Sequence, residues 1–139
     1  MILAIINSTI LLSLSLLHFY WAFGGQWGFT AALPTNKEGK RLLNPKWQHS
    51  LIVGAGLLVF AVYLLVYTDY ISLHLPDWML DSGIWIITVI FLMRAIGDFK
   101  YIGFFKKVKG TDFAIGDSKY FSLLCLWLAL SSLCLILLR

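Results

Sequence analysis

Four long runs of apolar residues dominate the chain, at about 2–23, 47–67, 83–105 and 120–138. Each run is close to the roughly 20 residues that an α-helix needs to cross a hydrocarbon core about 30 Å thick. Backbone N–H and C=O groups find no water inside a bilayer, so each run must satisfy them internally, as a helix does. The pattern therefore predicts an all-α, polytopic membrane protein with four transmembrane helices in one bundle, a single membrane domain over residues 1–139.

The composition excludes an ordinary soluble domain. Of the 139 residues, 60% are hydrophobic and only 13% are charged, whereas soluble domains carry about 25% charged residues. The formal net charge is +4, but the basic residues gather in two connecting loops, which is typical of topology signals. We therefore expect membrane lipids, and no nucleic acid, as partners.

The distribution of charge between the loops predicts the orientation. The connectors after the first and third runs are rich in lysine and arginine, whereas the connector after the second run contains aspartates and no lysine or arginine. The basic residues of the two connectors are Lys37, Lys40, Arg41, Lys46, Lys106, Lys107, Lys109 and Lys119. Basic loops remain in the cytoplasm, so both basic connectors are expected there and both termini outside.

The first connector begins with an unusual segment, WAFGGQWGFTAALP, at residues 21–34. It is too apolar for a simple polar loop, and its glycines would bend or break a helix. One interpretation is a bent or re-entrant segment near the inner leaflet, which must be covered by protein or line a cavity. The other is a loose interfacial loop.

The third run carries ionisable residues in an otherwise apolar context. On a continuous helix Arg94 and Asp98 would share a face, with Tyr101 one further turn along. A charge inside a bilayer costs roughly 2.5–3.5 kcal/mol, so such residues usually face the protein interior and have a partner. Two interpretations follow: an Arg94–Asp98 pair that pins one helix, or the wall of a polar pocket.

With the expected topology, polar groups of all four helices meet in the cytoplasmic half of the bundle. The fourth helix contributes Asp117, either as its N-cap or as part of the same polar set. We assign catalytic roles to His18 and Asp98. The residues expected to bind a ligand are Arg94, Trp21, Trp27, Tyr101, Gln26 and His49.

These residue types indicate acid–base chemistry or anion binding. An imidazole near a carboxylate can move protons, and a guanidinium can hold a carboxylate, a phosphate or a developing oxyanion. Neither an HxxxH nor an HExxH spacing is present, and Arg94 would oppose a cation, so no metal and no other cofactor is expected. The leading hypothesis is a pocket for a small amphiphile or lipid, with or without acid–base catalysis. The alternatives are a small homo-oligomeric transporter or channel and a structural or accessory membrane module.

Three motifs, HFYWAFGGQWGFTAALP, RAIGDFKYIGFFK and TDFAIGDSKYFSLLCL, together with the helix pattern, resemble a family of small bacterial membrane proteins catalogued as a domain of unknown function. The resemblance covers nearly the whole chain. The recurring positions are His18, Trp21, Ala22, Gly24 and Gly25 in the first motif and Arg94, Ala95, Gly97 and Asp98 in the second. The resemblance implies a four-helix membrane fold in the bacterial inner membrane, and it implies no particular activity.

Overall fold

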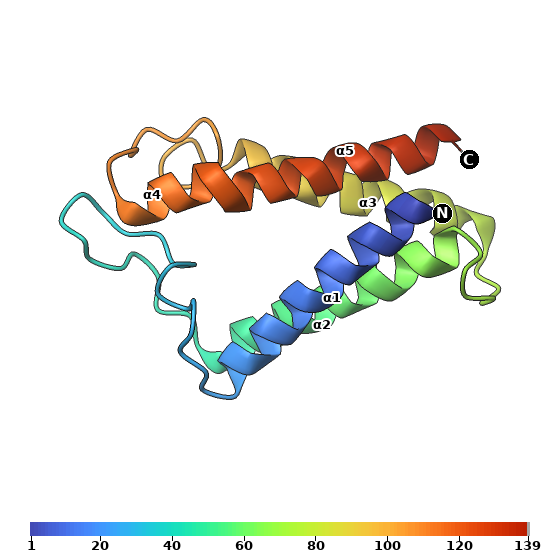
Figure 1. Cartoon of the computed structure of the whole chain (residues 1–139), viewed down its shortest axis with the longest axis horizontal. Coiled ribbons are helices and arrows are strands. Elements are labelled where there is room, and N and C mark those ends of the chain that lie inside the picture. The colour runs from blue at the N-terminus through green and yellow to red at the C-terminus, as the bar shows by residue number, and fades with distance from the viewer. Residues whose placement is uncertain (139) are drawn as a thin grey trace.

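The computed structural model describes residues 1–138 and is all-helical over that range (Figure 1). Its long helices are α1 (Ile2–Ala22), α2 (Trp47–Tyr67), α3 (Asp77–Ile96) and a final run of α4 (Asp112–Gly116), the π-helical turn η1 (Asp117–Phe121) and α5 (Ser122–Leu138). Within the described residues, four helices are long and apolar enough to cross a membrane. The predicted fold class is confirmed, and the chain is a multi-pass membrane protein.

The third helix differs from the predicted range of 83–105, because it begins at Asp77 and ends at Ile96. Its start follows Pro76, and the carboxylate of Asp77 in the first turn favours a helix N-terminus. Its end is set by Gly97, whose φ of +88° turns the chain out of the helix. The apolar sequence after Gly97 therefore forms a loop, although its composition suits a membrane span.

The fourth helical run also begins earlier than the predicted residue 120. Thr111 is the N-cap of α4, and its Oγ1 accepts a hydrogen bond from the backbone N–H of Ala114 at 3.0 Å. Helical structure then continues through η1 into α5. As a result Asp117 lies inside the helical run and is not its N-cap.

The helices form two hairpins that diverge like the arms of a V (Figure 1). Helix α1 packs along α2, and α3 packs along α5. The hairpins meet at the closed end, which holds the loop 68–76 and both ends of the described chain, and separate toward the open end, which holds the loops 23–46 and 97–111. The two hairpins are therefore in close contact only near the closed end.

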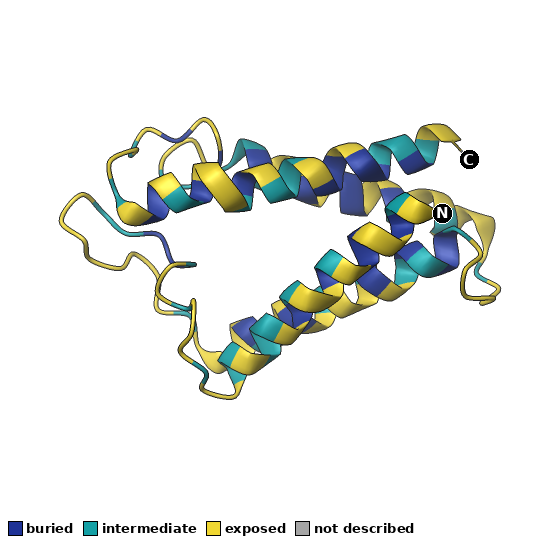
Figure 2. Ribbon diagram, in the orientation of Figure 1, coloured by how far each residue is buried: buried dark blue, intermediate teal, exposed yellow. Residues whose placement is uncertain are grey.

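Small polar residues hold the helices together. Ser15 Oγ donates to the carbonyl oxygen of Gly54 at 2.6 Å, which brings α1 and α2 close together. At the closed end the buried Asn7 donates from Nδ2 to Ser131 Oγ at 2.7 Å and so joins α1 to α5. Buried residues follow the inward faces of the helices, whereas most outward positions are exposed (Figure 2). The exposed outward side chains are mostly large and apolar, as expected for contact with lipid.

Candidate functional site

A cavity of about 490 Å³ lies between the two hairpins, on the open-end side of their contact. Side chains of α1, α2, α3, η1 and α5 line it, together with Ala32 of the first loop. Most of the lining is apolar, including Leu57, Phe60 and Phe91. His18 and Arg94 are its ionisable polar residues on opposite hairpins. The cavity therefore has a mostly apolar wall that includes one imidazole and one guanidinium.

His18 has a defined hydrogen-bonding state. Its Nδ1 lies 2.8 Å from the carbonyl oxygen of Leu14, which can only accept a hydrogen bond, so Nδ1 carries a proton. In the neutral ring Nε2 is then an acceptor. The ring also packs edge-on against Trp21, with centroids 4.9 Å apart. These contacts orient the imidazole in the cavity wall.

Trp21 connects the cavity to the glycine-rich segment of the first loop. Its Nε1 donates to the carbonyl oxygen of Trp27 at 2.8 Å, and its ring packs edge-on against Phe29. A smaller cavity of about 160 Å³ next to these rings is lined by His18, Trp21 and His49, among others. The first loop therefore folds back onto the end of α1, and His49, in the first turn of α2, lies close to the main cavity.

Arg94 reaches from the last turn of α3 to the final helical run. Its Nη2 donates to Oδ1 of Asp117 at 2.8 Å, in an ion pair whose acidic side chain is completely buried. About a third of the Arg94 side chain is exposed, yet its Nη1 is buried and has no hydrogen-bond partner within residues 1–138. A buried N–H donor without a partner is costly. One half of the guanidinium is therefore satisfied, whereas the other half carries a buried donor that is unpaired in the described part of the chain.

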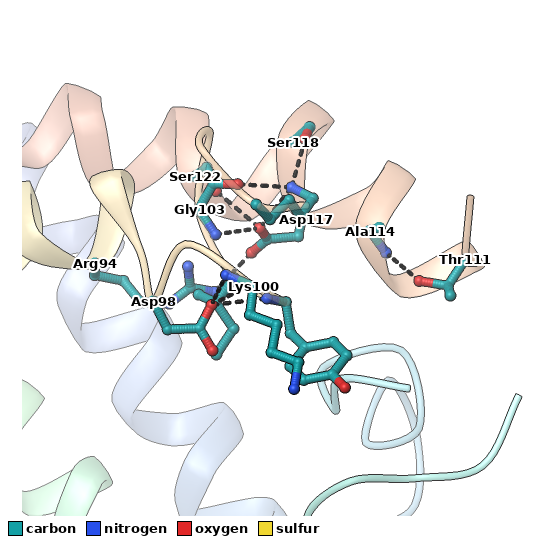
Figure 3. Close-up of polar contacts among 12 residues, drawn as sticks. Arg94, Asp98, Lys100, Gly103, Thr111, Ala114, Asp117, Ser118 and Ser122 are labelled. Carbon is teal, nitrogen blue, oxygen red and sulfur yellow. Dashed lines mark hydrogen bonds and ion pairs between the residues drawn. The ribbon is translucent and has the colours of Figure 1, made fainter. Parts of the chain in front are cut away.

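Asp117 is the centre of the polar network (Figure 3). Besides the bond from Arg94, its Oδ2 accepts from the backbone N–H of Gly103 at 2.8 Å, from Lys106 Nζ at 3.0 Å and from Ser122 Oγ at 3.0 Å. We call Arg94, Gly103, Lys106, Asp117 and Ser122 the Asp117 cluster. It ties the loop after α3 to the final helical run.

Lys106 is buried to an unusual degree for a lysine, with 1% of its side chain exposed. Its Nζ donates to the carbonyl oxygen of Gly103 at 2.8 Å and to Ser118 Oγ at 2.6 Å, in addition to Asp117. An ammonium group has three protons, and all three find an acceptor here. All the hydrogen-bond donors of Lys106 Nζ are therefore occupied inside the cluster.

The π-helical turn η1 explains how Asp117 and Ser122 meet. The backbone N–H of Ser122 bonds to the carbonyl oxygen of Asp117, five residues earlier. In a regular α-helix, residues five apart lie on different faces. The wider turn brings the two side chains to 3.0 Å, and such turns are frequent at functional sites.

Asp98 is not one turn further along a helix from Arg94, and the predicted Arg94–Asp98 pair is wrong. Because α3 ends at Ile96, Asp98 lies in the following loop, where its side chain is exposed. Its Oδ1 accepts from three successive backbone N–H groups at 2.7–2.9 Å, those of Lys100, Tyr101 and Ile102. Asp98 therefore shapes the turn after α3.

The same hydrogen bonds affect the pKa of Asp98. Burial by itself would raise the pKa, but the N–H donors of Ile102, Lys100 and Tyr101 favour the charged form and hold the pKa below its ordinary value of 3.8. The carboxylate is therefore ionised at neutral pH and acts as an acceptor for the loop.

This lowered pKa predicts a pH-dependent stability. A carboxylate with a lower pKa in the folded state stabilises the fold above its unfolded-state pKa, and this contribution is lost as the pH falls through the folded-state pKa. We expect the melting temperature of the wild type to decrease below about pH 4 and that of Asp98→Asn to decrease less over the same range. Thermal unfolding of both proteins by circular dichroism across an acid series checks this. Identical pH profiles would contradict the role of the three N–H donors.

The structure brings together only part of the predicted site. His18, Trp21 and Arg94 line the main cavity, and His49 lines its small neighbour. The other predicted residues, all within the described chain, are outside the main lining: Gln26, Trp27, Asp98 and Tyr101. Trp27 is 75% exposed, Gln26 Nε2 lies 3.4 Å from the carbonyl oxygen of Gly24, and the ring of Tyr101 lies 5.1 Å from Lys100 Nζ.

Sequence reasoning does not assign Lys106 to the site, and it leaves Asp117 between a helix N-cap and a member of the polar set. Lys106 was counted as a topology signal among the basic loop residues, and Asp117 was interpreted first as a helix N-cap. The pair Thr111–Asp112 is a stronger N-cap signal, because a threonine cap followed by an acidic first turn marks a helix start. Placing the helix start there would have left Asp117 within an apolar helix, where a carboxylate needs partners.

Comparison with curated proteins and with solved structures gave no match. The sequence profile of one protein family does match, over residues 11–132, which include most of both hairpins, the residues that line the cavity and the Asp117 cluster. This agrees with the resemblance seen in the sequence motifs. The chain belongs to the family described as protein of unknown function (DUF3995).

Proposed function

We propose that this membrane protein binds a small amphiphile, whose apolar part occupies the cavity between the two hairpins. The observation that supports this most strongly is the cavity itself. Its volume of about 490 Å³ lies within the roughly 300–1,000 Å³ that is usual for small-molecule sites. An apolar lining with a few polar groups is also usual for such sites, because the apolar wall supplies affinity and the polar groups set orientation.

The lipid bilayer is the natural source of such a ligand. The α1–α2 and α3–α5 hairpins diverge toward the open end, and the outward faces of both carry large exposed apolar side chains (Figure 1, Figure 2). An amphiphile could therefore enter sideways from the lipid. The basic connectors lie at the open end, so we place this end at the cytoplasmic surface of the bacterial inner membrane, with both termini outside.

Binding is favoured over acid–base catalysis by the positions of the carboxylates. Asp98 lies outside the cavity lining, and its Oδ1 accepts three backbone hydrogen bonds. Asp117 is completely buried, and both its oxygens are occupied by donors. Neither carboxylate is placed to exchange a proton with His18, so we assign His18 to the wall of a binding site.

The proposal is tested by filling the cavity. Gly56 of α2 lines the cavity, and a Cβ added there would meet no atom within 4 Å, so Gly56→Leu should place a side chain in the ligand space without a clash. We expect Gly56→Leu to weaken binding of a brominated long-chain alcohol at least about tenfold, since the ligand loses its apolar contacts. Binding is measured in phosphatidylcholine nanodiscs as the quenching of tryptophan fluorescence by bromine. The part of this quenching that is absent from Trp21→Phe reports binding in the cavity, because Trp21 lines it.

The matched control is Ala55→Leu, which adds apolar volume at the next position of α2 on an exposed face. It should bind the alcohol as the wild type does. Equal binding by Gly56→Leu and Ala55→Leu, or the absence of Trp21-dependent quenching in the wild type, would contradict the proposal.

A further inference from the structure

The proposed binding site has a half-satisfied cation in its wall, and this indicates the chemistry of the ligand's head group. We infer that the head group is a monoanionic carboxylate, bound by Nη1 of Arg94, and that the ligand is a single-chain amphiphile. This inference rests on the proposed function. Its first observation is that Nη1 is buried without a partner, while Nη2 of the same guanidinium is held by Asp117.

The second observation is the charge of the Asp117 cluster. It contains two cations, Arg94 and Lys106, and one carboxylate, Asp117. Lys106 and Asp117 are almost fully excluded from solvent and Nη1 of Arg94 is buried, so the surplus positive charge is poorly hydrated. An unpaired charge in such surroundings is costly, and a bound anion of charge −1 would neutralise the cluster.

Hydrogen-bond geometry favours a carboxylate at this place. The Asp117 carboxylate holds Nη2 of Arg94 through one N–H bond of 2.8 Å, which is the distance expected for a charge-assisted bond. A second carboxylate at Nη1 would make the same kind of bond on the other side of the guanidinium. A phosphate monoester, with about −1.5 to −2 charges, would leave the cluster with surplus negative charge.

The size of the cavity favours one chain. At roughly 30 Å³ for each water-sized group, the cavity of about 490 Å³ accommodates on the order of sixteen such groups. That is the size of one long alkyl chain with a small head group, whereas the two chains of a membrane phospholipid would extend beyond the cavity. Leu57, Phe60 and Phe91 would surround this chain.

The test compares three brominated probes of equal chain length: a carboxylate, an alcohol and a trimethylammonium. They are measured in phosphatidylcholine nanodiscs, by Trp21-dependent quenching, at an alkaline pH where the carboxylate is ionised. One charge-assisted hydrogen bond gives about a tenfold gain in affinity. We therefore expect the wild type to bind the carboxylate about tenfold more tightly than the alcohol, and the trimethylammonium most weakly.

The matched variant is Arg94→Gln, which removes the guanidinium and leaves Asp117 paired with Lys106, a neutral pair. The preference of the wild type for the carboxylate over the alcohol should be lost in Arg94→Gln, and continued Trp21-dependent quenching by the alcohol reports that the cavity is intact. Arg94→Lys, which keeps the positive charge, should retain part of the preference.

The outcomes separate this inference from the proposed function. If the wild type binds no probe in the cavity, the proposed function fails. If it binds the carboxylate and the alcohol equally, the amphiphile site stands and the anionic head group is wrong. If phosphatidylglycerol competes as strongly as the single-chain carboxylate, the assignment to one chain is overturned.

Discussion

Asp117→Asn should lower the free energy of unfolding by about 3–5 kcal/mol, the cost of breaking a buried ion pair by removing one partner. The substitution keeps the size of the side chain and removes its charge. Arg94 and Lys106 would then be left without a counterion, and Lys106 is almost completely buried. The measurement is reversible unfolding in mixed detergent micelles, followed by circular dichroism.

The matched control is Asp112→Asn, the same chemical change on the same helical run at an exposed position. Surface substitutions usually change stability by less than about 0.5 kcal/mol. Adding Lys106→Met to Asp117→Asn should restore part of the lost stability, because it removes one of the two unpaired cations. If Asp117→Asn and Asp112→Asn unfold alike, Asp117 is not the organising residue of the cluster.

The four membrane spans were predictable because their signal is local. A run of about 20 apolar residues in a chain this hydrophobic has few alternatives to a transmembrane helix. The first two helices, Ile2–Ala22 and Trp47–Tyr67, accordingly lie close to their predicted ranges. The end of α3 was not predictable from hydropathy, since it depends on the backbone conformation of Gly97 and on the side chain of Asp98.

The candidate site was predictable only in part, for a related reason. Arg94 and His18 were identified because a polar side chain in an apolar run is costly and needs a hydrogen-bonding or charged partner. The partner of Arg94 was not identified, because Asp117 lies 23 residues away and is brought near by the packing of α3 against the final helical run. Helical spacing predicted Asp98 as the partner of Arg94 instead, on the assumption that α3 continues through Gly97.

The divergence of the hairpins also could not be predicted from the sequence pattern. All four helices are apolar on nearly every side, so periodicity does not indicate which faces pack together. Contacts such as Ser15 to Gly54 and Asn7 to Ser131 determine the arrangement. These contacts depend on side chains from distant parts of the chain, and the cavity between the hairpins is a result of them.

The loop after α3 turns back on itself at two glycines, Gly97 and Gly103. The backbone N–H of Phe104 bonds to the carbonyl oxygen of Ala95 at 2.9 Å, so residues 97–103 form a closed loop against the end of α3. Gly97 and Gly103 lie against each other in this loop, with φ angles of +88° and +86°. Residues with a Cβ rarely adopt such angles.

Gly97→Ala and Gly103→Ala should each cost about 3 kcal/mol or more, through backbone strain and a steric clash. A Cβ on Gly97 would lie 1.8 Å from the carbonyl oxygen of Ile102, and one on Gly103 would lie 2.3 Å from that of Ile96. These atoms belong to the backbone, so a rotamer change does not relieve the clash. The measurement is again unfolding in mixed micelles, together with the yield of folded protein.

The control is Gly110→Ala, in the same loop, where a Cβ would meet no atom within 4 Å and the φ angle is not positive. It should be nearly neutral. Because the N–H of Gly103 donates to Asp117, combining Gly103→Ala with Asp117→Asn should cost less than the sum of the two single changes. Full additivity would mean that the loop and the carboxylate are stabilised independently. Coupling would show that the turn at Gly97 and Gly103 and the buried carboxylate that holds Arg94 stabilise the fold jointly, through the backbone N–H of Gly103.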